Sequence, residues 1–208
     1  MMSALEGLER LRDGNRRFVA GTGKGVVTDS SQRLALTGGQ APFAIILGCS
    51  DSRVPAEIVF DQGLGDLFVI RVAGNIVAAS QVGSVEFAAA RFGTRLVVVL
   101  GHSQCGAITA TVEELQRPTD NQSRNLRSIV DRVRPSVETL LATELRDDPE
   151  RLVELAVRAN IRTSANHLRH GSEILESLIQ TDGLMVVGAE YSLMTGVVEF
   201  FDGVPATW

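Results

Sequence analysis

The sequence predicts an α/β fold: a mostly parallel central β-sheet with an antiparallel edge hairpin, flanking helices and an N-terminal helical extension. Continuously apolar runs such as "PFAIILG" and "TRLVVVLG" are typical of strands that are buried on both faces of a parallel sheet. These runs alternate with longer stretches of helical pattern, as in β-α-β units. Two final apolar runs, "LMVVGAEY" and "TGVVEFF", predict the edge hairpin.

The N-terminal arm, residues 1–38, is expected to be helical. Ser3 with Glu6 three residues later has the capping-box pattern, so a helix should begin there and run to about Gly21. Its leucines lie roughly on one face, which should therefore pack against another part of the protein. A glycine-rich connector and a short helix near 31–36 then lead to the first strand.

Residues 39–208 are expected to form the α/β core, and the whole chain a single domain, because no repeat or linker interrupts it. The predicted elements are strands at 42–48, 66–72 and 94–101, a helix at 80–93, a helix from about Cys105, helical stretches at 125–145 and 149–181, and the hairpin strands at 184–191 and 195–201. Pro135 is expected to kink or break the helical stretch that contains it.

Composition and charge exclude several classes of function. The chain has 20 basic and 25 acidic residues and is 5% aromatic, and its arginines are scattered, so we expect no nucleic-acid partner. Charges recur through the N-terminus, unlike in a secretory signal, and no apolar run is long enough to span a bilayer. We therefore expect a cytoplasmic protein without a membrane partner, whose two cysteines are metal ligands or catalytic thiols rather than a disulfide.

Both cysteines lie just past predicted strands. Cys49 follows the first strand in "ILGCSDSRVP", and His102 and Cys105 follow the third in "VVLGHSQCGA". The H-x-x-C spacing lets an imidazole and a thiolate reach one point, and Cys49 can join them if the two strands are neighbours. Two sulfurs and one nitrogen suit zinc and leave a fourth position open, as catalytic zinc requires. Alternatively, the two thiols only fill the core.

A carboxylate and a guanidinium follow Cys49 in the same loop. Asp51 and Arg53 are spaced so that they can form a bidentate pair. Beside a metal, Arg53 could hold Asp51 away from the zinc, and Asp51 could accept a hydrogen bond from a metal-bound hydroxide. The alternative is an ordinary surface ion pair of little energetic value.

These motifs together resemble the β-class carbonic anhydrases, with a plant-type-like active site. The similarity covers "CSDSRVPAEIVFDQGLGDLFVIRVAGN" and "GHSQCGA", runs from about residue 14 to 106, and continues more loosely to the final hairpin. The resemblance implies a carbonate dehydratase, a zinc lyase of carbon utilization that hydrates CO2 reversibly to bicarbonate and a proton through zinc-bound hydroxide. It assigns one Zn²⁺ per subunit to Cys49, His102 and Cys105, with Asp51 and Arg53 as the catalytic pair.

The resemblance also implies a substrate site and an oligomer. Gln40 matches a glutamine that hydrogen-bonds substrate oxygen, typically across a dimer interface, so we expect a homodimer or a homotetramer. Phe87 stands where plant enzymes have tyrosine, which removes a hydroxyl near the pocket. The residues expected to line the apolar pocket are Phe68, Val69, Ala73, Asn75 and Phe87.

Some family members have a closed state in which the aspartate itself ligates zinc, stabilised by bicarbonate in a separate pocket. Those members carry a tryptophan where this chain has Ile46, so we expect no bicarbonate switch. Asp51 could still ligate zinc at low pH, because its carboxylate is within reach of the metal.

Three other functions are compatible with the same residues. A hydrolase of carbonyl sulfide or carbon disulfide would use the same zinc site, with a different pocket. A thiol redox protein would form a Cys49–Cys105 disulfide and leave Asp51, Arg53 and His102 without roles. A zinc-stabilised binding module without turnover would have its metal closed off permanently by Asp51.

Overall fold

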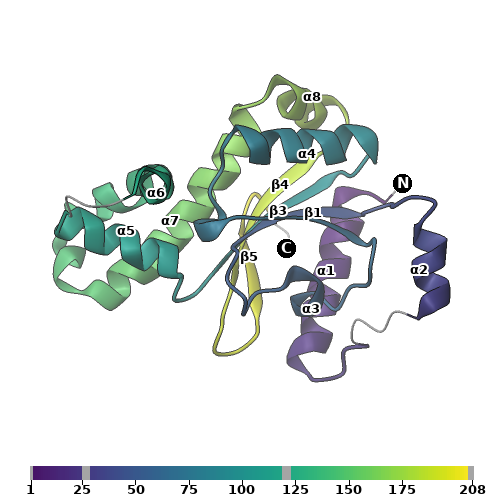
Figure 1. Ribbon diagram of the computed structural model, residues 1–208, viewed down its shortest axis with the longest axis horizontal. Helices are drawn as coiled ribbons and strands as arrows, with labels where there is room; N and C mark the ends of the chain where they lie inside the picture. Colours follow the sequence, from purple (N-terminus) through teal and green to yellow (C-terminus); the bar gives the residue numbers. More distant parts are fainter. Residues whose placement is uncertain (1, 25–28, 119–122, 206–208) are drawn as a thin grey trace.

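A computed structural model describes residues 2–24, 29–118 and 123–205 (Figure 1). The strands are β1 (Ala44–Gly48), β2 (Leu67–Arg71), β3 (Leu96–His102), β4 (Met185–Tyr191) and β5 (Val198–Asp202). The α-helices are α1 (Ala4–Val19), α2 (Ser30–Leu36), α3 (Ala56–Val59), α4 (Ala79–Arg91), α5 (Gly106–Gln116), α6 (Arg124–Leu141), α7 (Pro149–His170) and α8 (Glu173–Thr181). Two 3-10 helices, η1 (Ala73–Asn75) and η2 (Glu144–Asp147), join some of them.

The five strands form one sheet in the order β2-β1-β3-β4-β5. Strands β2, β1, β3 and β4 are parallel, and β5 pairs antiparallel with β4 at the edge. The predicted fold class is therefore confirmed. The neighbouring positions of β1 and β3 matter for function, because both strands end at the same edge of the sheet.

Each strand contributes to two cores because successive side chains point to opposite faces of the sheet. On one face, Ile45 and Val97 pack with residues of α4 to α8. On the other face, Ile46 and Val98 pack with α1, α3 and β5. Figure 1 shows these layers, with α4 and α8 on one side of the sheet and α1 and α3 on the other. Among the described residues, no helix combines the length and the apolar character needed to cross a bilayer.

The N-terminal helix begins as expected and packs on the sheet. Ser3 N–H donates to Glu6 Oε2 at 2.8 Å, and Ser3 Oγ accepts from Glu6 N–H at 3.3 Å, which completes the capping box. Buried Asn15 then ties α1 to the rest of the fold. Its Nδ2 donates to the carbonyls of Val59 and Gly196 at 3.2 and 2.9 Å, and its Oδ1 accepts from Val198 N–H at 2.9 Å.

Two predictions about the late helices are wrong in part. The predicted stretch 149–181 is divided into α7 and α8, because Ser172 caps a new helix by accepting from Leu175 N–H at 3.2 Å. Pro135 does not break its helix and lies inside α6. A proline removes one helical hydrogen bond, and the buried Val133 and Val137 on either side of it pack α6 against the core.

Helix α7 lies close against β3 and β4 at two glycines. A Cβ added to Gly101 would lie 2.5 Å from Ile161 Cδ1, and one added to Gly188 would lie 2.8 Å from Ile161 Cγ2. Larger residues at these positions would force the side chain of Ile161, or α7 itself, to move. The glycines therefore let the middle of α7 approach the end of β3, next to the side chains discussed below.

Candidate active site

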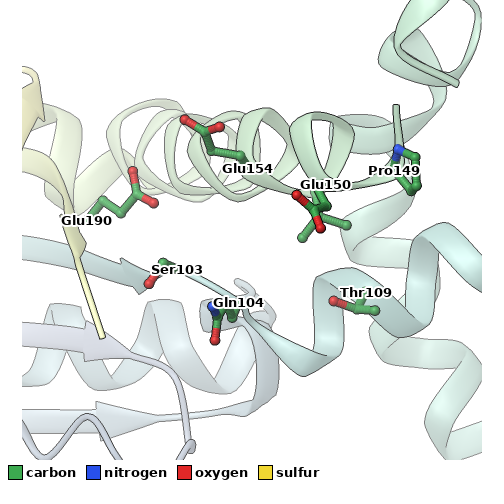
Figure 2. A pocket seen from close by; sticks show the side chains of 8 residues that line it. Ser103, Gln104, Thr109, Pro149, Glu150, Glu154 and Glu190 are labelled. Carbon is green, nitrogen blue, oxygen red and sulfur yellow. The ribbon is translucent and has the colours of Figure 1, made fainter. Parts of the chain in front are cut away.

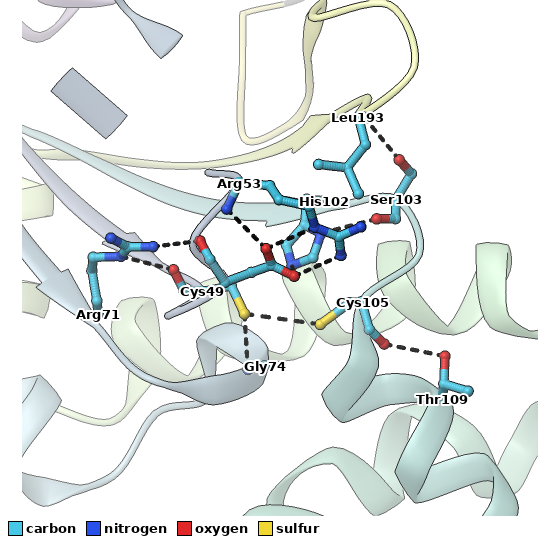
Figure 3. A network of polar contacts seen from close by, with 10 residues as sticks. Cys49, Arg53, Arg71, Gly74, His102, Ser103, Cys105, Thr109 and Leu193 are labelled. Carbon is cyan, nitrogen blue, oxygen red and sulfur yellow. Dashed lines mark hydrogen bonds and ion pairs between the residues drawn. The ribbon is translucent and has the colours of Figure 1, made fainter. Parts of the chain in front are cut away.

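The structure brings Cys49, His102 and Cys105 together at the carboxyl end of the sheet. Cys49 directly follows β1, His102 ends β3, and Cys105 precedes α5. The candidate ligand atoms of the three side chains all lie within 4.8 Å of one another, and the two sulfur atoms are 4.0 Å apart. All three residues are buried. Figure 3 shows the two sulfurs and the imidazole facing a common point.

The imidazole of His102 leaves one nitrogen free for a metal. Its Nδ1 is 2.9 Å from the carbonyl oxygen of Ser103, and since a carbonyl only accepts, Nδ1 carries the proton. Its Nε2 is buried without a hydrogen-bond partner among the described residues. An unpaired buried polar atom beside two thiols fits a metal ligand, and a set of two sulfurs and one nitrogen suits zinc.

The electrostatics of the three residues favour a positive charge at this point. The thiol of Cys105 lowers the pKa of Cys49, helped by His102 and by the backbone N–H groups of Asp51 and Gly74, although burial opposes the shift. The same contact raises the pKa of Cys105. Burial lowers the pKa of His102, but Cys49, the backbone of Ser103 and the charge of Asp51 together raise it above its ordinary value. Either a proton or a metal cation would satisfy this arrangement.

Asp51 and Arg53 form the bidentate pair that their spacing predicts. Arg53 donates from Nε to Oδ1 of Asp51 at 2.9 Å and from Nη2 to Oδ2 at 2.7 Å, and its backbone N–H donates to Oδ1 at 3.0 Å. Oδ2 of Asp51 lies 3.8 Å from His102 Nε2. Hydrogen bonds from Arg53 hold the pKa of the Asp51 carboxyl well below its usual range, against a smaller effect of burial. The carboxylate is therefore ionised and fixed beside the candidate ligands.

Arg71 is a further part of the site that the sequence did not indicate. It lies opposite Gly48 in the pairing of β2 with β1. Its Nε donates to the carbonyl of Cys49 at 3.0 Å, and its Nη2 donates to the carbonyl of Asp51 at 2.5 Å (Figure 3). These two bonds fix the backbone of the loop that carries the candidate ligand and the carboxylate. Arg71 could be found only from the register of β2 against β1, which the sequence alone does not give.

Ala73 and Asn75 lie in η1, directly beside Cys49. The backbone N–H of Gly74 donates to Cys49 Sγ at 3.4 Å. Asn75 is buried, and its side-chain Nδ2 lacks a partner among the described residues. Both residues were expected to border the substrate, and the structure places them near the candidate ligands.

Two other residues expected near the substrate lie away from the candidate metal ligands. Gln40 precedes β1 in an exposed segment, whereas Cys49 follows β1, so the two residues lie at opposite ends of that strand. Val69 is paired with Ile46 in the sheet and packs in the core on the side of α1. Neither residue joins the cluster of candidate ligands in its own chain.

Phe68 and Phe87 form an aromatic group with Phe92. The ring centroids of Phe68 and Phe87 are 6.3 Å apart, and Phe92 lies 6.0 and 5.7 Å from them. Phe87 is 54% exposed. This group lies at the β2 edge of the sheet and on α4, so its exposed face is available to another molecule.

A separate pocket of about 550 Å³ opens beside the segment between β3 and α5. Figure 2 shows Glu190 of β4 and two glutamates of α7 around it. Its lining residues are Ser103, Gln104, Thr109, Pro149, Glu150, Val153, Glu154 and Glu190. Burial raises the pKa of Glu190. None of the three candidate metal ligands lines this pocket.

Comparisons with known proteins agree with this geometry. Residues 44–198 match the family model of carbonic anhydrases. The chain is 41% identical over 186 residues to carbonic anhydrase 2 of Mycobacterium tuberculosis, which covers 89% of this chain and 87% of that protein. The crystal structure of the β-carbonic anhydrase CafA of Aspergillus fumigatus matches with a TM-score of 0.74 at 25% identity, covering 85% of this chain and 83% of that one. The chain belongs to the β-carbonic anhydrase family.

Another solved β-carbonic anhydrase is similar to this chain. A structure from a study of two tetrameric β-carbonic anhydrases of Sordaria macrospora matches with a TM-score of 0.69 at 26% identity, covering 81% of this chain and 85% of that chain.

The predicted family is confirmed, and so is the prediction of an enzyme, because the family is one of carbonate dehydratases.

Proposed function

We propose that this β-carbonic anhydrase hydrates CO2 reversibly to bicarbonate and a proton, with one zinc ion per subunit held by Cys49, His102 and Cys105. The observation that carries the proposal is the unpaired, buried Nε2 of His102 next to two thiols. Bound zinc lowers the pKa of a water molecule towards neutrality and so supplies a nucleophile near pH 7. A reducing compartment such as the cytoplasm would keep both thiols available.

The residues around the cluster would orient the reacting groups. The ionised Asp51 can only accept hydrogen bonds, and its Oδ2 lies 3.8 Å from the free nitrogen of His102. Asp51 would accept a hydrogen bond from the O–H of the attacking oxygen, and a lone pair of that oxygen would then be directed at CO2. Arg53 occupies both carboxylate oxygens and so favours an arrangement in which Asp51 stays off the metal.

The rest of the substrate site would come from a second subunit. Gln40 and the aromatic group of Phe68 and Phe87 lie outside the cluster of their own chain, and Phe87 is exposed. We therefore infer a homodimer or a homotetramer in which Gln40 of the partner subunit hydrogen-bonds a substrate oxygen. Ala73 and Asn75 would border the substrate from the same chain, because η1 adjoins Cys49.

Stopped-flow CO2 hydration on protein with a measured zinc content tests the proposal. The wild type should bind one zinc ion per subunit and turn over CO2 faster as the pH rises from neutral to alkaline. Cys49→Ala should lose both zinc and activity, whereas Ser50→Ala, an exposed neighbour, should keep both. Full zinc occupancy with turnover of carbonyl sulfide but not of CO2 would favour the hydrolase. Protein that binds no zinc and forms a disulfide under oxidation would favour the thiol redox function.

A further inference from the structure

Helix α7 donates two hydrogen bonds to the backbone of η1. Asn160 Nδ2 donates to the carbonyl of Gly74 at 2.7 Å, and Ser164 Oγ donates to the carbonyl of Asn75 at 2.9 Å. The two donors are four residues apart and so lie on one face of the helix. Their residues are only 1% and 4% exposed. Buried side chains of this kind are retained only when they are hydrogen-bonded, and here both bonds go to the same turn.

The turn that they hold has an unusual backbone conformation. Gly74 and Asn75 have φ values of 71° and 43°, so two successive residues are left-handed. A non-glycine residue in this region is uncommon and needs support from its surroundings. The space around Gly74 is also closed, since an added Cβ would lie 3.1 Å from Ala107 Cβ and 3.6 Å from Val133 Cγ2.

This conformation directs one N–H at a candidate metal ligand. Gly74 N–H donates to Cys49 Sγ at 3.4 Å, as the dashed line in Figure 3 shows. A hydrogen bond to a thiolate fixes its direction and withdraws electron density from its sulfur. Groups that hold a ligand in this way change the metal affinity of a site without touching the metal.

We propose that Asn160 and Ser164 are positioning residues for Cys49: by fixing the carbonyls of Gly74 and Asn75, they keep the Gly74 N–H on the Cys49 sulfur. The proposal rests on the zinc site of the proposed function. Helix α7 thus supports the site through the backbone of η1, although Asn160 and Gly74 are 86 residues apart in the sequence. Its close approach over Gly101 and Gly188 makes this contact possible.

A neighbouring hydrogen bond of the same helix provides a matched control. Ser136 Oγ donates to Thr163 Oγ1 at 3.0 Å and links α6 to α7, one residue before Ser164. Ser136 is buried, like the two proposed positioning residues. It makes no hydrogen bond to η1, so Ser136→Ala should lower the stability of the fold without changing the environment of Cys49.

The test compares Asn160→Ala, Ser164→Ala and Ser136→Ala with the wild type, all as full-length protein. Zinc affinity is measured by competition with a chromophoric chelator, and thermal unfolding is measured on the metal-free protein. Loss of the positioning contact should weaken zinc binding by about tenfold or more. In the cobalt-substituted protein, the thiolate-to-cobalt charge-transfer band should move to longer wavelength, because the sulfur regains electron density. Ser136→Ala should show neither change.

The proposal fails if Asn160→Ala and Ser164→Ala bind zinc as tightly as Ser136→Ala and leave the cobalt band in place. If Asn160→Ala does not fold, Ser164→Ala decides the matter, because it removes only one hydroxyl. Failure of the proposed function is a different result, in which the wild type itself binds no zinc or turns over no CO2. A wild type that is active and three variants that behave alike would overturn the positioning role only.

Discussion

Replacing Gly101 with alanine tests how closely α7 is packed on the sheet next to His102. The new methyl carbon would lie 2.5 and 2.6 Å from Cδ1 and Cγ1 of Ile161. Since carbon atoms are in favourable contact at about 3.5 to 4.0 Å, the helix or its side chain must yield by about 1 Å. Overpacking of this kind costs about 1 to 3 kcal/mol. For a chain of this length, that corresponds to a fall in Tm of about 2 to 12 °C.

A double-mutant cycle separates this clash from other effects of the substitution. Ile161→Ala removes both clashing atoms and alone should cost about 2 to 5 kcal/mol, because it leaves a cavity. In the double variant, the alanine methyl occupies part of that cavity. The cost of the double variant should therefore be smaller than the sum of the two single costs by about 0.5 kcal/mol or more.

Urea unfolding of the four proteins, at fixed protein and zinc concentrations, measures the cycle. Gly83→Ala in α4 is the control, because nothing lies within 4 Å of its added Cβ. It should raise the free energy of unfolding by about 0.5 to 1 kcal/mol, the usual gain of alanine over glycine within a helix. Strict additivity of Gly101→Ala and Ile161→Ala, or a Gly101→Ala variant as stable as the wild type, would refute the close packing.

Three further substitutions probe the site and its support. Arg53→Ala removes both guanidinium bonds to Asp51; kcat/KM for CO2 hydration should fall about 10- to 100-fold with Tm almost unchanged, and an unaltered kcat/KM would contradict the proposed role. Asn15→Ala leaves the N–H of Val198 without its buried partner, and the free energy of unfolding should fall by about 1 to 3 kcal/mol in a urea titration. A negligible change would show that Asn15 does not help to hold α1 on the fold. Burial raises the pKa of Glu190, so the folded state disfavours its ionised form, and stability is lost as pH rises from the ordinary pKa of a glutamate through that raised pKa. Glu190→Gln should therefore raise Tm at neutral pH, and this advantage should vanish below about pH 4, where the carboxyl is protonated in both states; an advantage that persists there would contradict the assignment.

The strands and the candidate ligands could be predicted because their signals are local. Each strand is a short apolar run with its own flanking residues, and His102 and Cys105 share one motif. Cys49 joined them on one assumption, that β1 and β3 are neighbours, and the sheet order confirms it. Asp51 and Arg53 are also local, since their pairing depends on a spacing of two residues in one loop.

The missed features depend on contacts between distant segments. Arg71 reaches the Cys49 loop only through the register of β2 against β1, and Asn160 reaches Gly74 only because α7 crosses the sheet closely. Pro135 does not break its helix, because the packing of α6 overrides its local effect. The division between α7 and α8 did have a local signal, Gly171 followed by Ser172 as a helix cap.

The placement of the two cysteines also affects the order of folding. Cys49 and Cys105 are 56 positions apart, and they meet only after β1 has paired with β3. In a nascent or unfolded chain, His102 and Cys105 are close in sequence but Cys49 is not held beside them, so tight binding at the proposed zinc site would require this long-range pairing. Most of the binding energy at the proposed zinc site would then stabilise the folded state, and the metal would link the two ends of a long loop of the chain as a cross-link does. A strong chelator should accordingly act on this protein as a mild denaturant.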